Sequence, residues 1–207
     1  MPTTDKLDLY KQHKDQYKAT QQPQILTLPP IPYLAVDGEG KPGDDLFAEI
    51  MGALYGMAYT LKFMAREQGR DYVVAKLEGM WYPVGGFDQP IENPSEMTWQ
   101  YKLLVRVPEF ITDANLAAAR EQLAKKKKEG PFEKVHLEVI SEGTVVQAMH
   151  IGPYAEETPT LERMHAYAAE QGYKHTHGHH EIYLGDPRRV APEKLKTLLR
   201  TPVEKAG

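Results

Sequence analysis

A repeated order of short motifs limits the folds that are open to this chain. Residues 67–69 read Glu-Gln-Gly at the end of an amphipathic segment, and residues 170–172 repeat these letters at the end of another. Each is followed by a basic, leucine-containing segment that closes on a proline, at residues 102–108 and 196–202. Because the matches keep the same order, we interpret the chain as a duplicated module.

Each half predicts the same series of elements: strand, helix, strand, strand. The first strand of each series ends in glycine, at Gly38 and at Gly152. We therefore expect an α+β fold in which tandem strand-helix-strand-strand modules, at about residues 23–110 and 134–207, form one domain. Two such modules leave a cavity at their pseudo-twofold junction, a place where ligand pockets are common.

Two segments lie outside the repeats. Residues 1–22 are polar and predict an N-terminal arm with Leu7, Tyr10 and Tyr17 as its anchors. Residues 111–133 predict a helical segment that joins the repeats, capped by Thr112 or Asp113.

The helices of the two repeats have clear sequence signals. Apolar residues recur at three- and four-residue steps from Leu46 to Met64, which predicts a helix over residues 44–68. In the second repeat, Thr158 before Pro159 is typical of an N-cap and first turn. That helix is expected to run to Gln171.

A hairpin is expected early in the second half. Residues 134–141 and 144–151 are strand-like, and Glu142-Gly143 stands between them. An acidic residue followed by glycine between two such runs indicates a tight reversal.

The segment 179–184 reads His-His-Glu-Ile-Tyr-Leu and lies between two turn signals. As a strand, it places His179, Glu181 and Tyr183 on one face. The opposite face can join a core only with His180 at its edge. A carboxylate in mid-strand is costly unless it is solvated, paired or used, so the Glu181 face is either a solvated surface or the floor of a ligand pocket.

Other residues with functional potential have alternative interpretations. The aromatic residues after the first helix are core residues or stacking surfaces for a flat ligand; they are Trp81, Tyr82, Trp99 and Tyr101. His150 faces the cavity or is a hydrogen-bonded structural histidine. The histidines at residues 175–180 are typical of solvated loop positions with one pocket histidine, and we expect no metal and no cofactor.

Composition excludes several classes of protein. The chain has no cysteine and a formal charge of −4, so a thiol nucleophile is absent and no overall attraction to nucleic acid is expected. No apolar run is long enough for a membrane span, and no signal core follows Met1. We expect a cytoplasmic protein that binds neither nucleic acid nor membranes; a protein partner is not indicated.

Six motifs, taken in order, resemble the GyrI-like small-molecule-binding family, and most closely its stand-alone bacterial members. They are PYLAVDGEG (32–40), YTLKFM (59–64), LEGMW (77–81), EGTVVQ (142–147), HIGPY (150–154) and HHEIYL (179–184) followed by Asp186-Pro187. The resemblance implies two tandem modules around a ligand cavity. It places Glu181 and Tyr183 in that cavity and makes Trp81 an aromatic wall.

The resemblance also implies a function. Related domains bind flat or cationic compounds, and some stand-alone members hydrolyse the cyclopropane of DNA-alkylating compounds. A detoxifying hydrolase of electrophilic aromatic molecules is therefore expected; the alternative is a module that only sequesters or senses such compounds. For hydrolysis, Glu181 would be the general base, with Tyr183, or more weakly His150, as a hydrogen-bond donor.

Overall fold

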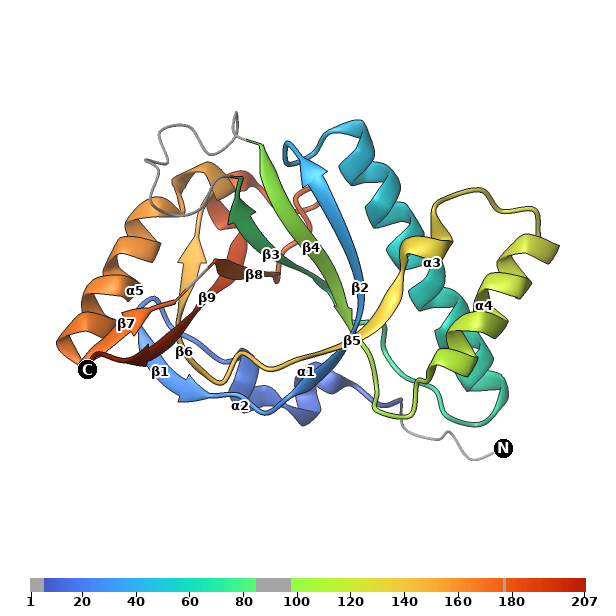
Figure 1. Cartoon of the computed structure of the whole chain (residues 1–207), viewed down its shortest axis with the longest axis horizontal. Helices are drawn as coiled ribbons and strands as arrows, with labels where there is room; N and C mark the ends of the chain where they lie inside the picture. Colours follow the sequence, from blue (N-terminus) through green and yellow to red (C-terminus); the bar gives the residue numbers. More distant parts are fainter. Residues whose placement is uncertain (1–5, 85–97, 177) are drawn as a thin grey trace.

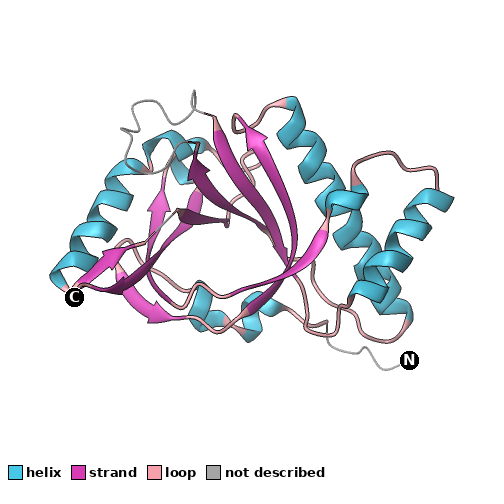
Figure 2. Cartoon of the chain, viewed as in Figure 1, coloured by secondary structure: helices cyan, strands magenta, loops and turns pink. Residues whose placement is uncertain are grey.

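The computed structural model of the chain describes residues 6–84, 98–176 and 178–207. Its strands form an antiparallel sheet in the order β1-β6-β9-β8-β3-β4-β2-β5, and helices lie around it (Figure 2). The strands are β1 (Gln24–Thr27), β2 (Ile31–Gly40), β3 (Leu77–Pro83), β4 (Trp99–Arg106), β5 (His136–Ile140), β6 (Thr144–Ile151), β8 (His179–Tyr183) and β9 (Lys196–Lys205). A short strand, β7 (Tyr173–His175), pairs with β9 outside this order.

The middle of the sheet has a twofold order. Strands β6-β9-β8 of the second half meet strands β3-β4-β2 of the first half where β8 pairs with β3. Along the chain, the first half runs β2, α3 (Asp45–Glu67), β3, β4, and the second runs β6, α5 (Thr158–Glu170), β8, β9. The predicted α+β fold with tandem strand-helix-strand-strand modules is confirmed, while the residue boundaries of the repeats stay a prediction.

The predicted hairpin around Glu142-Gly143 is wrong, because β5 pairs with β2 and β6 pairs with β1. Tight two-residue hairpins need a positive φ at their first central residue. Among the non-glycine residues that the structure describes, only Lys127 has a positive φ, so Glu142 does not supply it. Gly143, with φ 66°, turns the chain without reversing it.

The two segments instead form a continuous antiparallel ribbon. Thr27 lies opposite Thr144 and Ile31 opposite Ile140, so the register is the same on both sides of the interruption. The backbone N–H of Leu28 donates to the carbonyl of Gly143 at 2.8 Å and bridges the gap. Because this ribbon joins the two ends of the strand order, it closes the sheet into a barrel (Figure 1).

Helix α3 covers the outside of the first half of the barrel (Figure 1). Asp44 caps it, since a carboxylate oxygen accepts from the N–H of Phe47 at 2.7 Å. The predicted apolar face is buried from Ile50 to Leu61, but Leu46 in the first turn stays 39% exposed.

The remaining helices begin close to their predicted starts. α4 (Asp113–Lys125) has Thr112 as its N-cap in a capping box with Asn115. α5 begins at Thr158 itself, so the N-cap position falls on Glu157, whose side chain makes no capping hydrogen bond. In the part of the chain that the structure describes, no helix is long and apolar enough to cross a membrane.

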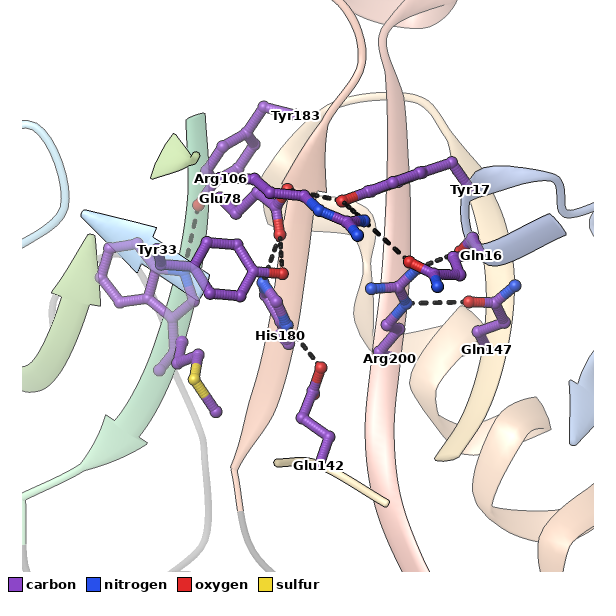
Figure 3. Close-up of polar contacts among 12 residues, drawn as sticks. Gln16, Tyr17, Tyr33, Glu78, Arg106, Glu142, Gln147, His180, Tyr183 and Arg200 are labelled. Atoms are coloured by element: carbon purple, nitrogen blue, oxygen red, sulfur yellow. Dashed lines mark hydrogen bonds and ion pairs between the residues drawn. The ribbon is translucent and has the colours of Figure 1, made fainter. Parts of the chain in front are cut away.

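A network of polar side chains lies inside the barrel (Figure 3). The Nε2 atom of His180 lies 3.1 Å from Oε2 of Glu78, and its Nδ1 atom lies 3.1 Å from Oε2 of Glu142. Burial alone would lower the pKa of His180, but Glu142 and Glu78 outweigh it and raise this pKa to about 9. His180 is thus a buried imidazolium. The prediction that it lies at the edge of a core is wrong, because the two carboxylates offset the cost of burying its charge.

The N-terminal arm closes one end of the barrel with two short helices, α1 (Leu9–Gln12) and α2 (Lys14–Tyr17). The hydroxyls of Tyr10 and Tyr17 donate to Oε1 of Glu78 at 3.1 and 3.4 Å. The guanidinium of Arg106 donates to the Tyr17 hydroxyl at 2.9 Å (Figure 3). Both tyrosines therefore anchor the arm, as predicted, through a carboxylate in the middle of the sheet.

Candidate active site

A cavity of about 1200 Å³ opens on the outer face of the barrel, bounded by residues of α3 and α5 and by the central strands β3 and β8. It lies at the junction of the two modules, where the sequence predicts a ligand cavity. Its aromatic lining comes from Phe47, Tyr55, Tyr59, Trp81, Trp99, Tyr154 and Tyr183. A space of this volume and lining suits a large aromatic molecule.

One wall of the cavity is a second stripe of α3. Phe47, Met51, Tyr55 and Tyr59 recur at four-residue steps and all line the cavity. The sequence interpretation followed only the face that packs on the sheet and missed this stripe, although the same helical period reveals it. The sequence signal for this wall is a second, mainly aromatic set of residues at four-residue steps, next to the aliphatic set on the same helix.

Tyr183 and Trp81 form the floor of the cavity. The indole N–H of Trp81 donates to the Tyr183 hydroxyl at 3.0 Å. Between them lies Gly79, where an added Cβ would stand 2.9 Å from Nε1 of Trp81 and 3.1 Å from the Tyr183 hydroxyl. The missing side chain at Gly79 therefore leaves the room in which Trp81 and Tyr183 meet.

Glu181 is the point on which the polar groups of the cavity converge. Nε2 of His179 lies 2.8 Å from its Oε1. The Tyr183 hydroxyl also forms a hydrogen bond to Glu181, and burial, followed by the charges of Glu181 and Glu157, raises the pKa of Tyr183 well above its ordinary value. Tyr183 is therefore a neutral donor, and Glu181 is its acceptor.

Glu157 supplies a second carboxyl group, which sequence reasoning missed. Its side chain is 6% exposed and forms a hydrogen bond to Glu181. Burial, and then the charge of Glu181, raises the pKa of Glu157 well above its ordinary value. We therefore place the shared proton on Glu157, with Glu181 as the carboxylate. The available signal was an acidic residue immediately before the predicted helix start at Thr158, a few residues after Gly152-Pro153.

Glu157, His179 and Glu181 each place one possible metal ligand atom within 4.8 Å of the others. A cation held by all three would displace the direct hydrogen bonds from His179 and Glu157 to Glu181. We assign the group to proton sharing, which uses the contacts that are present.

The sequence-predicted site residues separate into two groups. Those that line the cavity are Glu181, Tyr183, Trp81 and Trp99. Trp99 stands edge-on to Trp81 with ring centroids 6.3 Å apart, and Phe47 stacks on Trp81 at 6.0 Å. These five side chains come from α3, β3, β4 and β8, so the fold brings together residues that are far apart in the sequence.

The structure places the other three predicted residues away from the cavity lining. Tyr82 follows Trp81 along β3 and therefore points into the barrel, where its hydroxyl lies 3.7 Å from Sδ of Met80. Tyr101 packs behind Trp81, with ring centroids 5.3 Å apart.

His150 is a structural histidine. Its Nδ1 atom lies 3.1 Å from Oγ1 of Thr160, and its Nε2 atom lies 3.1 Å from the carbonyl oxygen of Pro153. Both ring nitrogens are used to hold the entry to α5, so the predicted ligand contact of His150 has no support in this placement.

The histidine-rich segment does not act as a unit. His179 faces the cavity, His180 faces the barrel, and His175 stacks on His165 with ring centroids 4.4 Å apart. Burial, followed by the neighbouring histidines, lowers the pKa of His165 to about 4. His177 lies outside the described residues.

The sequence pattern of the GyrI-like small molecule binding domain matches residues 21–204. The chain belongs to this family. The family resemblance predicted from the six motifs is confirmed.

Several solved structures are similar to this chain. An uncharacterized conserved protein from Listeria innocua is 36% identical, has a TM-score of 0.89, and the match covers 96% of this chain and 100% of that chain. A hydrolase from Listeria innocua is 35% identical with a TM-score of 0.87, covering 97% of this chain and 100% of that chain. The C-terminal domain of EcmrR, 14% identical with a TM-score of 0.58 over 89% of this chain and 98% of that chain, shares the fold alone. No curated protein matches this GyrI-like chain.

Proposed function

We propose that this GyrI-like protein is a hydrolase that detoxifies flat, aromatic, electrophilic molecules by opening a strained ring, as in cyclopropane-bearing DNA alkylators. The observation that carries the proposal is a pair of hydrogen-bonded carboxyl groups, Glu157 and Glu181, on an aromatic cavity. A site that only held aromatic compounds would not need two buried carboxyl groups in contact, because their burial is costly.

The two carboxyl groups have different environments and thus different roles. Glu157 is held neutral by burial and by the neighbouring charge of Glu181. Glu181 accepts hydrogen bonds from its neighbours and stays the carboxylate. Two carboxyl groups with separated protonation states are the usual arrangement for an acid and a base that work together.

Water can then open the ring with Glu181 as the base and Glu157 as the acid. The water oxygen forms a bond to a cyclopropane carbon while a ring C–C bond breaks, and the electron pair of that bond moves through the conjugated system to a carbonyl oxygen. Glu181 takes the proton of the water. The carbonyl oxygen receives a proton from Glu157, with Tyr183 as a further hydrogen-bond donor near Glu181.

The hydrogen bond between the carboxyl groups closes the cycle. After the reaction, Glu181 holds the proton of the water and Glu157 has lost its own. Transfer of that proton from Glu181 to Glu157 along their hydrogen bond restores both groups, and the net change is the addition of one water molecule to the substrate.

The aromatic residues position the substrate. Trp81 is fixed by Tyr183 through its indole N–H and by Phe47 through stacking. Its ring and that of Trp99 both line the cavity, so a planar ligand can stack on one and meet the edge of the other. Trp81→Ala should therefore weaken binding more than it slows the chemical step. The hydrolase of Listeria innocua at 35% identity supports a hydrolytic role for this fold.

Mass analysis of product tests the proposal. A cyclopropane-bearing DNA alkylator is incubated with substoichiometric protein, and we expect several equivalents of a product heavier by one water molecule. Glu170→Gln, an exposed substitution on α5, is the matched control and should leave this rate unchanged. Complete recovery of unmodified alkylator with the wild-type protein would contradict hydrolysis.

The second candidate is a module that sequesters or senses such compounds. The size and aromatic lining of the cavity serve binding as well as they serve turnover. A pure binder would protect one equivalent of alkylator per protein and release it unchanged, so stoichiometry and product mass separate the two functions.

A further inference from the structure

We infer that His179 is a positioning residue of the carboxyl pair: it donates its Nε2–H to Oε1 of Glu181 and thereby fixes Glu181 as the carboxylate and Glu157 as the acid. The inference rests on the proposed function, in which these two groups are base and acid. It assigns a role to a residue whose side chain lines the cavity beside them.

The placement of His179 follows from the strand. His179 and Glu181 are two residues apart on β8, so their side chains leave the same face. Nε2 of His179 lies 2.8 Å from Oε1 of Glu181. The imidazole stands edge-on to Trp99, with ring centroids 6.3 Å apart and planes at 88°, which supports its orientation.

Three donors then converge on one carboxylate. Glu181 accepts from His179, from the Tyr183 hydroxyl and from the protonated Glu157. An ionised carboxylate has about four acceptor positions on its two oxygens. Three are occupied, which leaves one for the water molecule that Glu181 would deprotonate.

The hydrogen bond from His179 also makes the two carboxyl groups, Glu157 and Glu181, unequal. His179 contacts Glu181, while Oε1 of Glu157 is buried without a hydrogen-bond partner. A donor to the ionised form of one partner favours the ionised form of that partner. Without His179, the proton would be shared more evenly, and Glu181 would be the base for a smaller fraction of the time.

Other titratable groups face this cluster from each neighbouring element. They include Tyr183 on β8, Tyr154 before α5, His165 and Glu162 on α5, His175 on β7, Tyr55 and Tyr59 on α3, and Lys76, Asp186 and Arg188 in loops. Burial and the charges of Glu157 and Glu181 raise the pKa of Tyr154 to about 12, and burial keeps His165 neutral. Neither of these groups changes charge near neutral pH, so they do not replace the contribution of His179.

Two substitutions separate hydrogen bonding from packing. His179→Phe keeps a ring against Trp99 but removes the donor, and His179→Gln restores a neutral N–H of similar reach. For the phenylalanine variant we expect kcat to fall roughly 10- to 10²-fold, the scale of a misplaced reacting group. Its KM should change little, and the acid limb of its kcat/KM profile should move to higher pH. The glutamine variant should recover most of kcat and keep the wild-type acid limb.

Carbon NMR of protein with labelled glutamate side chains gives a readout without turnover. In the His179→Phe variant the carboxyl titration of the Glu157 and Glu181 pair should move upward in pH, and in His179→Gln it should stay near that of the wild type. An unchanged titration and unchanged kcat in His179→Phe would overturn the inference, as would equal losses in both variants. If the wild-type protein hydrolyses no alkylator but the NMR titration still moves, the positioning role holds and the proposed hydrolysis fails.

Discussion

His180 and Glu181 are neighbours in the chain, yet their side chains enter different compartments of the molecule. His180 lies inside the barrel between Glu78 and Glu142, and Glu181 lines the ligand cavity on the outside. The alternation of a single strand thus separates a charge that stabilises the fold from a charge that is available for chemistry.

The charge of His180 makes stability depend on pH. The pKa of His180 is about 9 in the folded protein and about 6.5 when it is unfolded. Because the folded value is raised, the stabilisation is complete below about pH 6.5 and is lost as the pH rises through about 9, at a total cost of about 3 kcal/mol.

Urea denaturation across this pH window measures the effect. His180→Gln should be less stable than the wild type near pH 6.5. Its free energy of unfolding should show little of the wild-type decline as the pH rises toward 9. His136→Gln, at a partly exposed position on β5, is the control and should keep the decline. A wild-type free energy of unfolding that is flat from pH 6.5 to 9 would show that the imidazolium does not contribute.

Gly79→Ala should disturb the floor of the cavity. The new Cβ would stand 2.9 Å from Nε1 of Trp81 and 3.1 Å from the Tyr183 hydroxyl, so their hydrogen bond must lengthen or break. We expect a loss of about 1–3 kcal/mol in stability and a shift in tryptophan fluorescence. Gly52→Ala, at an exposed position of α3 where the new Cβ would meet no atom within 4 Å, should be neutral or slightly stabilising. Equal effects of the two substitutions would refute the close-approach argument.

Tyr17→Phe should loosen the N-terminal arm. The hydroxyl accepts from Arg106 and donates to Glu78, so its removal leaves two buried charged groups with one partner fewer. The expected loss is about 1–3 kcal/mol in the free energy of unfolding. Tyr59→Phe, at a side chain that is 49% exposed, should change it by less than about 0.5 kcal/mol. Identical thermal denaturation of both variants would show that the hydroxyl of Tyr17 has no such role.

The cavity should prefer neutral or cationic aromatic compounds to anions. Glu181 and the aromatic faces attract a cation, while Arg188 on the lining is already paired with Asp186, with Nε 3.0 Å from Oδ1. In thermal-shift assays with dyes of similar size, cations should raise the melting temperature most. Stronger stabilisation by the anionic dyes would argue against this electrostatic preference.

Local periodicity predicted the parts of the fold that depend on neighbours in the chain. The apolar steps of α3 and the shared face of Glu181 and Tyr183 both follow from helix or strand geometry. The predicted hairpin at Glu142-Gly143 is wrong because the same two residues suit both a hairpin turn and a bend within a long antiparallel ribbon. Pairing with the distant strands β1 and β2 decides between them.

The rest of the site depends on contacts between distant segments. Glu157 precedes Glu181 by a whole helix and a strand, so no local pattern links the two carboxyl groups. Tyr82 and Tyr101 have the composition of a ligand wall, but their side chains pack inside the barrel and behind Trp81. Which of several aromatic residues reaches a cavity is decided by how α3 and α5 sit on the sheet.

The division of labour between Glu181 and Glu157 is the central claim, and Glu181→Gln tests it most directly. The amide nearly preserves the shape of the side chain but cannot take a proton from water. Turnover of a cyclopropane-bearing alkylator and the binding of a non-reactive analogue should be measured on the same preparation. We predict a fall in kcat of roughly 10²-fold or more, with the affinity for the analogue largely kept. Wild-type turnover by the Glu181→Gln protein would contradict the general-base role.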